Sequence, residues 1–324
     1  MIPITDIRAW GNVVPWKNDE QVELDLVISR SLVEIYSDKY LAEKLVFRGG
    51  TALHKLFLSP QSRYSEDIDL VQKNAGPIKS IIDRLRKVLS FLGNPRVKQK
   101  SNNNTLIFRF NSESTPPVPL RLKVEINCRE HFSILGYKER NFSVDSRWFK
   151  GSAHIQTYNL EELLGTKFRA LYQRKKGRDL FDLYQALAVL KPDPGIILSC
   201  YASYMDYNGV KVPTKKQFIN NLTEKLSDIE FLNDTNGILR TGEIYRPKEA
   251  FEFLQAKNYQ IQYLQMIPKS IQKIRVVSIG DFDFAACGGT HVANTSEIGK
   301  IKFLGTKNKG KLRERFFYNL DLDN

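Results

Sequence analysis

The segments FRGGTALHKLF (residues 47–57) and RYSEDIDL (residues 63–70) decide the fold expected for this chain. Gly49 and Gly50 interrupt a short apolar run, and the residues after them continue with the spacing of a helix. A glycine turn leading from a strand into a helix lets backbone N–H groups approach a phosphate closely, and the helix N-terminus favours negative charge. Gly49, Gly50 and the hydroxyl of Thr51 are placed for this contact.

Two aspartates follow on a strand-like segment. Asp67 and Asp69 are two residues apart, so on a strand they point to the same side and can share divalent ions. Two-metal phosphoryl transfer usually adds a third carboxylate from a neighbouring strand. Glu125 in LKVEIN is the best candidate, because its strand would pair beside the first. Alone, a Gly-Gly pair is usually a turn and an Asp-x-Asp pair a solvated edge, but together they indicate Mg²⁺ chemistry on a nucleoside triphosphate.

The composition is that of a globular protein with enough apolar residues for a core, 42% hydrophobic and 26% charged. A chain of 324 residues exceeds the usual single domain, so two or three units are expected. No apolar run approaches about 18 residues, and the N-terminus MIPITDIRAWGN lacks the pattern of a signal peptide. We therefore expect a cytoplasmic location and no membrane association.

The net charge and the cysteines add two further expectations. A net charge of +13 favours a polyanionic partner, with nucleic acid ahead of membrane. Cys128, Cys200 and Cys287 are too few and too scattered for a disulfide framework, so they are expected to be reduced thiols, with Cys287 a candidate metal ligand.

Hydrophobic spacing predicts the order of helices and strands. Helices are expected at 19–45, 51–58, 77–93 and 159–190. Strands are expected at 45–47, 67–71, 106–110 and 120–127, the last two paired across a polar, Pro-rich connection. Residues 196–270 read as mainly helical, and beyond Pro268 short strands are expected in IRVVSIG, KIKFLG and RERFFYNL.

Four of these segments together resemble the successive motifs of a known family. FRGGTALHKLF, RYSEDIDL, KVEIN and ELLGTKFRALYQRKKGRDLFDLYQAL are similar to those of the AbiEii/AbiGii-type nucleotidyltransferases, toxins of type IV toxin–antitoxin and phage-defence systems within the polymerase-β-like superfamily. The resemblance covers roughly residues 20–255. It implies Mg²⁺-dependent transfer of a nucleotide from an NTP to an acceptor, which is tRNA in characterised relatives, and a cognate antitoxin protein.

The resemblance also implies roles for individual residues. Gly49, Gly50 and Thr51 would hold phosphates, with Ser65 beside them; Asp67, Asp69 and Glu125 would hold Mg²⁺; Lys167 would meet the triphosphate, and Asp179 would complete the catalytic set. The chain departs from the superfamily in carrying Gly50 where a Gly-Ser pair is common. It also departs from the family in having Glu125 in place of an aspartate as the third ligand.

The helix around Lys167 supports this interpretation on physical grounds. Lys167 lies in an apolar stripe, where a lysine needs a partner or a functional anion. The run RKKGRD crowds four cations together, a footprint for a triphosphate or an RNA backbone: Arg174, Lys175, Lys176 and Arg178. A solvated basic turn is the alternative for Lys175 and Lys176. Of the two acids that follow, Asp179 is expected to be functional and Asp182 structural.

The C-terminal part carries a second resemblance. Within residues 272–318, CGGTH followed by TSEIG looks like the second additional domain of alanyl- and threonyl-tRNA synthetases, which free-standing alanyl-tRNA editing proteins share. There the Cys and His, here Cys287 and His291, bind Zn²⁺ together with an upstream HxxxH pair. No two of the four histidines are four apart, so a complete editing site is not expected. The alternatives are a zinc site completed by Asp281, Asp283 or a partner chain, and a fold kept without its metal.

The end of the chain is rich in cations and aromatic rings. The cations are Lys300, Lys302, Lys307, Lys309, Lys311, Arg313 and Arg315, and the rings are Phe303, Phe316, Phe317 and Tyr318. Such a surface suits a tRNA acceptor stem or a single-stranded end. A solvated basic edge that protects an end strand is the competing interpretation.

These observations predict an α+β fold in three parts. Residues 1–195 form a polymerase-β-like core, a small mixed sheet flanked by helices; residues 196–270 extend it with helices; residues 271–324 form a strand-rich cassette. The expected activity is Mg²⁺-dependent transfer of a nucleoside monophosphate from an NTP to an acceptor, with tRNA the expected one. The alternatives are a tRNA-binding module without transferase activity and an alanyl-tRNA-editing-like protein acting through the cassette.

Overall fold

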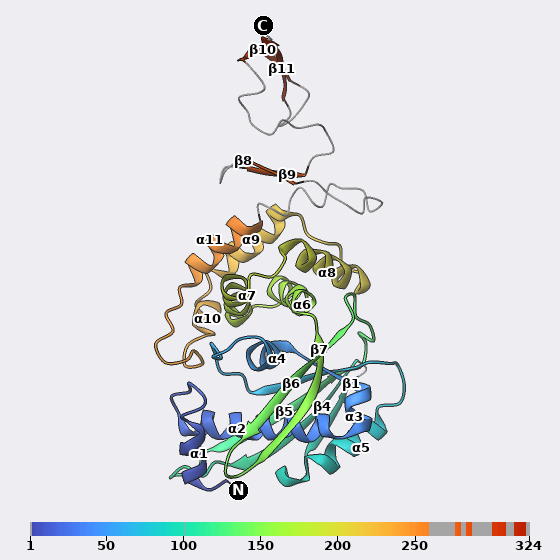
Figure 1. The fold of residues 1–324 in the computed structure, drawn as a ribbon, viewed down its shortest axis with the longest axis vertical. Coiled ribbons are helices and arrows are strands. Elements are labelled where there is room, and N and C mark those ends of the chain that lie inside the picture. The colour runs from blue at the N-terminus through green and yellow to red at the C-terminus, as the bar shows by residue number, and fades with distance from the viewer. Residues whose placement is uncertain are drawn as a thin grey trace. The chain divides into compact units, whose positions relative to one another are not determined.

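A seven-stranded mixed sheet carries the glycine turn and the aspartates (Figure 1). The computed structural model describes residues 2–100, 102–258, 276–279, 283–286, 300–308 and 314–321. The strands are β1 (Leu45–Arg48), β2 (Asp67–Gln72), β3 (Arg96–Lys100), β4 (Asn103–Asn111), β5 (Pro119–Asn127), β6 (Tyr137–Asp145) and β7 (Lys150–Tyr158), in the order β3-β4-β5-β2-β1-β7-β6. The pairs β2–β5 and β1–β7 are parallel, and the other neighbours are antiparallel. The predicted mixed sheet flanked by helices is therefore confirmed.

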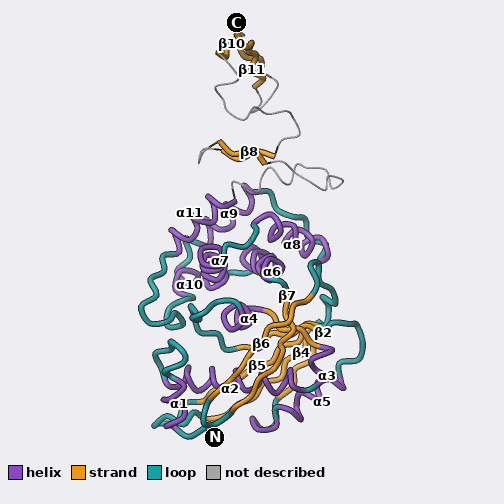
Figure 2. Tube along the Cα trace, in the orientation of Figure 1, coloured by secondary structure: helices purple, strands orange, loops and turns teal. Residues whose placement is uncertain are grey.

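Helices lie on both faces of this sheet (Figure 2). The first group is α1 (Ile4–Trp10), α2 (Asp19–Ser37), α3 (Lys39–Lys44), α4 (Gly49–Leu56) and α5 (Lys79–Val88), which is followed by a 3₁₀ turn at Ser90–Leu92. The second group is α6 (Leu160–Gln173), α7 (Gly177–Val189), α8 (Pro194–Tyr207), α9 (Lys215–Lys225), α10 (Ile229–Asn233) and α11 (Pro247–Asn258).

Two apolar cores hold the sheet and helices together. The first joins one sheet face to α1, α2 and α5, with Ile28, Ile68 and Phe108 all 0% exposed. The second joins α4 to the helices α6–α11 and includes Leu53 and Leu183. Alternation along β2 explains the division, because its even residues enter the first core while Asp67 and Asp69 face the other way.

Two predicted long helices are each broken in two. The segment 19–45 divides at Asp38, whose extended backbone ends α2 and whose carboxylate accepts a hydrogen bond from the Leu41 N–H at the start of α3. The segment 159–190 divides at Arg174, which is also extended and turns its guanidinium back onto Asp179. In both places a side-chain hydrogen bond replaces the continuous helix. The expected strands 106–110 and 120–127 pair as predicted.

Helices α6 and α8 approach each other closely at Gly165. A Cβ atom built on Gly165 would lie 2.7 Å from the Cys200 Cβ and 2.9 Å from the carbonyl oxygen of Ile197. Both distances are shorter than real contacts, so a side chain at this position would push the two helices apart.

The chain separates into two compact units, residues 1–262 and 263–324. In the second unit, β8 (Val276–Ile279) pairs with β9 (Asp283–Ala286), and β10 (Lys300–Asn308) pairs with β11 (Glu314–Asp321), both antiparallel. These strands agree with the expected strand-rich ending, although β9 was not expected. The proposed divisions at residues 195 and 270 stay predictions.

Candidate active site

The strands β2 and β5 bring the three predicted carboxylates together. They pair in parallel, with Asp69 opposite Glu125 and Asp67 opposite Lys123. Residues directly opposite in a sheet share a face, so all three acids lie on the face that is not filled by the first core. The Lys123 ammonium lies 3.5 Å from the Asp67 carboxylate.

The glycine turn lies directly against Asp69. Gly49 has a φ of +83°, which an L side chain adopts only with strain. A Cβ at Gly49 would also lie 2.1 Å from the Asp69 Oδ2, so this position excludes any side chain. Helix α4 begins here and directs its first N–H groups to the same region.

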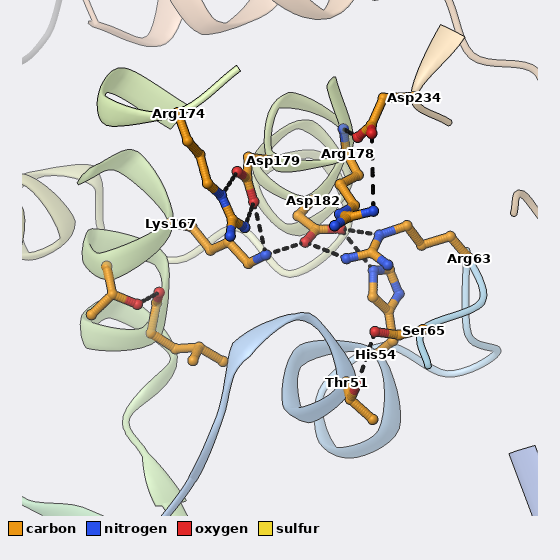
Figure 3. A network of polar contacts seen from close by, with 12 residues as sticks. Thr51, His54, Arg63, Ser65, Lys167, Arg174, Arg178, Asp179, Asp182 and Asp234 are labelled. Atoms are coloured by element: carbon orange, nitrogen blue, oxygen red, sulfur yellow. Dashed lines mark hydrogen bonds and ion pairs between the residues drawn. The ribbon is translucent and has the colours of Figure 1, made fainter. Parts of the chain in front are cut away.

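The other predicted phosphate ligands differ in how accessible they are. Gly50 and Ser65 line the cleft above the carboxylates. Thr51 is buried, and its hydroxyl lies 2.8 Å from the Ser65 hydroxyl and also contacts the carbonyl of Asp67 (Figure 3). Thr51 therefore joins the start of α4 to the segment leading into β2.

A cleft of about 1090 Å³ opens over this face of the sheet. It brings together Asp67, Asp69, Glu125, Gly50, Ser65 and Lys167 with the cations Arg63, Arg109, Arg121, Lys123, Arg174 and Arg178. A smaller cavity of about 340 Å³ continues past Gly49, Asp69 and Glu125 along α6. The volumes are in the range of pockets that bind small organic ligands.

Burial and the closeness of the acids raise the pKa values of Asp69 and Glu125. Burial raises the pKa of Asp69, and Asp67 adds to this against the opposing effect of Arg48. Burial likewise raises the pKa of Glu125, followed by repulsion from Asp69 and Asp67. Carboxylates that disfavour one another's charge in this way are stabilised when a cation binds between them.

The donor set fits Mg²⁺. Carboxylate oxygens on adjacent strands are the ligands that Mg²⁺ prefers, and this ion usually takes one or two carboxylates plus substrate phosphates. Within the part of the chain that the structure describes, no group of three or more His, Cys, Asp or Glu side chains is placed to hold a metal ion by itself. Asp67 and Asp69 would hold the ion together with a triphosphate, and Glu125 lies beside them.

Lys167 reaches the cleft from α6 and is held by two aspartates of α7 (Figure 3). Its Nζ lies 3.1 Å from Asp179 Oδ1 and 2.6 Å from Asp182 Oδ2. Asp179 is 0% exposed and also accepts two hydrogen bonds from Arg174, at 2.6 and 2.7 Å. Although burial opposes it, Lys167 and Arg174 lower the pKa of Asp179. Asp179 thus lies behind the cleft wall and positions two cations that line it.

Asp182 is the centre of a network that the sequence did not reveal. Both arms of Arg63 bind its carboxylate, and His54 Nε2 lies 2.9 Å from its Oδ1. Burial lowers the pKa of His54 to about 4, so the ring is neutral and Nε2 donates its hydrogen to Asp182. The expected structural role of Asp182 agrees with this position. His54 and Arg63 lie within the two opening motifs, but nothing in the local pattern links them to a residue more than a hundred positions away.

A second buried carboxylate, Glu130, joins Arg48 to Arg169. Arg48 Nη1 lies 2.6 Å from Glu130 Oε2, and Arg169 pairs with the other oxygen. Burial opposes ionisation, but Arg48 and Arg169 lower the pKa of Glu130 to about 2. This triad fixes the residue before Gly49 to α6, and no local pattern in the sequence predicts it.

The basic run RKKGRD is neutralised by acids rather than free. Lys175 pairs with Asp228, and both Lys176 and Arg178 lie near Asp234. Arg178 is anchored further, since its backbone N–H donates to Asp234 at 3.1 Å. Only Arg174 and Arg178 of this run line the large cleft, which favours the structural alternative for Lys175 and Lys176.

The predicted zinc ligands Cys287 and His291 lie outside the described residues. Cys128 and Cys200 are free cysteines. Among the described helices, none is long and apolar enough to cross a membrane.

Two family models match the chain. The first, the nucleotidyl transferase AbiEii toxin of type IV toxin–antitoxin systems, matches residues 30–260. The second, the threonyl and alanyl tRNA synthetase second additional domain, matches residues 274–316. Both resemblances noted in the sequence are therefore confirmed.

The curated relatives match through short segments. The alanyl-tRNA editing protein AlaX-M of Saccharolobus solfataricus is 36% identical over 104 residues, which cover 31% of this chain and 43% of that protein. AlaX-L of Pyrococcus horikoshii is 51% identical over 45 residues, 14% of this chain and 11% of that protein. An alanine–tRNA ligase of Streptococcus thermophilus is 61% identical over 33 residues, 10% of this chain and 4% of the ligase. The chain thus spans less than half the length of these relatives.

A solved nucleotidyltransferase structure shares the fold of this chain. MenT4, a nucleotidyltransferase toxin of Mycobacterium tuberculosis, superposes with a TM-score of 0.54 and 13% identity over 83% of this chain and 91% of its own. JHP933 of Helicobacter pylori gives a TM-score of 0.46 and 17% identity over 73% and 89%. The family match over residues 30–260 establishes that the chain belongs to the AbiEii nucleotidyltransferase toxins of type IV toxin–antitoxin systems.

Proposed function

We propose that this toxin transfers a nucleoside monophosphate from an NTP to a hydroxyl of an RNA acceptor, and that the acceptor is tRNA. The observation that carries the proposal is the placement of Asp67, Asp69 and Glu125 on two paired strands, beside the glycine turn and at the floor of a cation-lined cleft. Family membership supports the nucleotide as substrate and an antitoxin as partner.

Each residue of the cleft has a role that follows from its position. Mg²⁺, when bound, neutralises phosphate charge and aligns the α-phosphate for in-line attack. Asp67 and Asp69 would hold the ion, and Glu125, opposite Asp69 in the sheet, would be a third carboxylate ligand. The N–H groups at Gly49 and Gly50 receive the phosphates of the NTP. Lys167 and Arg174 face the same cleft and stabilise charge on the departing pyrophosphate.

Asp179 acts through other residues. It is buried and contacts both Lys167 and Arg174, so it holds two cations at the cleft wall without touching the substrate. A positioning role of this kind is common behind phosphate-binding cations, because long basic side chains lose less entropy on binding when they are already fixed.

The C-terminal segment supports tRNA as acceptor. Its match to a domain of alanyl- and threonyl-tRNA synthetases, and to alanyl-tRNA editing proteins, associates it with proteins that act on tRNA. The net charge of +13 favours a polyanion. We propose that this segment binds tRNA and leaves the chemistry to the larger unit.

One experiment tests these assignments together. The full chain and its Asp69→Asn variant are incubated with Mg²⁺, total tRNA and each of the four NTPs labelled on the α-phosphate, and RNA and protein are then separated. Label on tRNA with the wild type alone supports the proposal. Label on protein, or none with any nucleotide, overturns the RNA acceptor. Zinc bound at one equivalent together with hydrolysis of Ser-tRNA(Ala) would favour the editing alternative.

A further inference from the structure

The catalytic face of the sheet continues outward as a row of cations. Beyond the carboxylates, β5 contributes Arg121 and Lys123, β4 contributes Arg109, and the edge strand β3 contributes Arg96, Lys98 and Lys100. These six residues are named the cationic tract. No acidic residue lies on β3 or β4, and Glu125 is the only one on β5.

The strand register places the tract on the same face as the carboxylates. Asp67 lies opposite Lys123, which lies opposite Ile107, which lies opposite Arg96. The parallel row runs from Asp69 through Glu125 and Thr105 to Lys98. Because directly opposed residues share a face, each row is continuous from the metal ligands to the edge of the sheet.

The other face of the same strands is committed to the core. Leu106 and Phe108 on β4, and Leu122 and Val124 on β5, are all 0% exposed and belong to the first apolar core. The cations therefore cannot turn inward, and the tract is fixed on the open face by the two-residue period of each strand.

The charges of the tract are largely uncompensated. Arg96, Lys98, Lys100, Arg109 and Arg121 are exposed, and none of them forms an ion pair or side-chain hydrogen bond with another described residue. This contrasts with the basic run RKKGRD, whose cations are paired with acids. A row of unpaired like charges repels itself, and a bound polyanion relieves that repulsion.

The dimensions indicate a single strand of nucleic acid. Three strand spacings separate β2 from β3, so the tract extends about 14 Å from the carboxylates. Recognition of double-stranded RNA by shape uses contacts distributed over about 16 base pairs, much longer than this. A positively charged groove that follows one backbone is the usual means of binding a single strand.

We propose that the cationic tract binds the sugar–phosphate backbone of the single-stranded 3′ segment of the acceptor RNA and leads its terminal hydroxyl to Asp67 and Asp69. The inference rests on the proposed function and adds the path by which the acceptor enters. The charged side chains of this face are almost all cations, and contacts to phosphates carry no sequence information, so we expect binding that depends little on base sequence and falls steeply with salt.

Two triple variants test the tract. Arg96→Gln/Lys98→Gln/Lys100→Gln removes three of its charges, all on β3 and outside the lining of the large cleft, and Lys87→Gln/Lys138→Gln/Lys211→Gln removes three exposed cations from outside the tract. Fluorescence anisotropy with a labelled single-stranded RNA, without NTP, is measured over a series of KCl concentrations. We expect the tract variant to bind about tenfold more weakly and its slope of log K against log salt to fall by about 2, because each phosphate contact contributes about 0.7. The control should stay within about twofold of wild type.

Nucleotide transfer separates a failure of the tract from a failure of the proposed function. With tRNA as acceptor, the tract variant should raise the KM for RNA about tenfold and leave the KM for NTP unchanged. Equal RNA binding and transfer by the two variants would overturn the tract while the transferase assignment stands. Tract-dependent binding without transfer by any protein would overturn the transferase assignment and keep the tract. Failure of the wild type to bind single-stranded RNA would overturn the tract outright. Circular dichroism and thermal unfolding of each variant exclude loss of the fold.

Discussion

Arg63 and Asp182 form a bidentate ion pair, in which Nε lies 2.6 Å from Oδ1 and Nη2 lies 2.7 Å from Oδ2. Both side chains are almost completely buried. Lys167 and His54 contact the same carboxylate. A loop, helix α4, helix α6 and helix α7 therefore meet at one negative charge. Removing that charge leaves Arg63 buried without its acidic partner and leaves Lys167 paired with Asp179 alone.

Asp182→Asn is expected to lower the free energy of unfolding by about 3–5 kcal/mol, because breaking a buried ion pair exposes the desolvation cost of its partners. Urea unfolding measures the change. Asp145→Asn is the matched control, since the Asp145–Lys150 pair is 2.8 Å long but exposed and should contribute less than about 1 kcal/mol. Equal effects of the two substitutions would show that the network does not stabilise the fold.

Asp69→Asn is expected to reduce nucleotide transfer by about a thousandfold or more, since a metal ligand is lost. The free energy of unfolding of the variant should not fall below that of the wild type. Burial raises the pKa of Asp69, with Arg48 opposing the rise and Asp67 adding to it, so ionisation of this carboxyl carries a cost that the neutral amide does not. Thermal unfolding with and without Mg²⁺ provides the check: Mg²⁺ should raise the Tm of the wild type and leave the variant unchanged. A variant that keeps normal transfer would refute the catalytic assignment.

Gly49→Ala should impair activity through two separable effects. The backbone φ of +83° costs roughly 1–2 kcal/mol for any L residue. The new Cβ would in addition displace the Asp69 carboxylate, which lies 2.1 Å from its position. Gly93→Ala is the control, because Gly93 has a φ of +78° with no atom within 4 Å of the added Cβ. Both variants should lose stability through the backbone strain, but only Gly49→Ala should also lose nucleotide transfer. Equal transfer activities of the two variants would exclude an effect of the clash.

Glu130→Gln is expected to change the response to acid. The pKa of Glu130 is lowered from 4.5 to about 2 in the folded protein, so its stabilisation is complete above the unfolded value and is lost as the pH falls through the folded one. The shift corresponds to about 3 kcal/mol. The free energy of unfolding of the wild type should therefore fall between about pH 5 and 2. The variant should have a lower free energy of unfolding at pH 7, and this value should change less with pH over the same range. Denaturant unfolding at several pH values tests it, and parallel curves would contradict the assignment.

The sequence alone predicted those parts of the site that depend on the two-residue alternation of a strand or on the pairing of neighbouring strands. Asp67 and Asp69 share a face because strand side chains alternate, and Glu125 joins them because β5 lies next to β2. Lys167 was expected to need a buried partner, and it has two, Asp179 and Asp182. Each of these inferences needs only spacing along one element, or pairing of two neighbouring strands.

Contacts between distant segments were not predictable in this way. Arg63 and Asp182 are 119 residues apart, and neither residue carries a local sign of the other. The hairpin of β6 and β7 was missed because β6, YKERNFSVD, is mostly exposed and lacks a clear apolar alternation. The helix breaks at Asp38 and Arg174 depend on side-chain hydrogen bonds that compete with helical spacing.

Gly165 helps to set the position of Lys167 in the cleft, although it lies on the face of α6 that packs against α8. It lies two residues before Lys167, roughly 200° around α6, and rests on the backbone of α8. The absence of a side chain at Gly165 thus allows the short distance between α6 and α8. We expect any larger residue there to push α6 away from α8 and to shift Lys167 along the cleft wall, which would change nucleotide transfer without replacing any residue that lines the cleft.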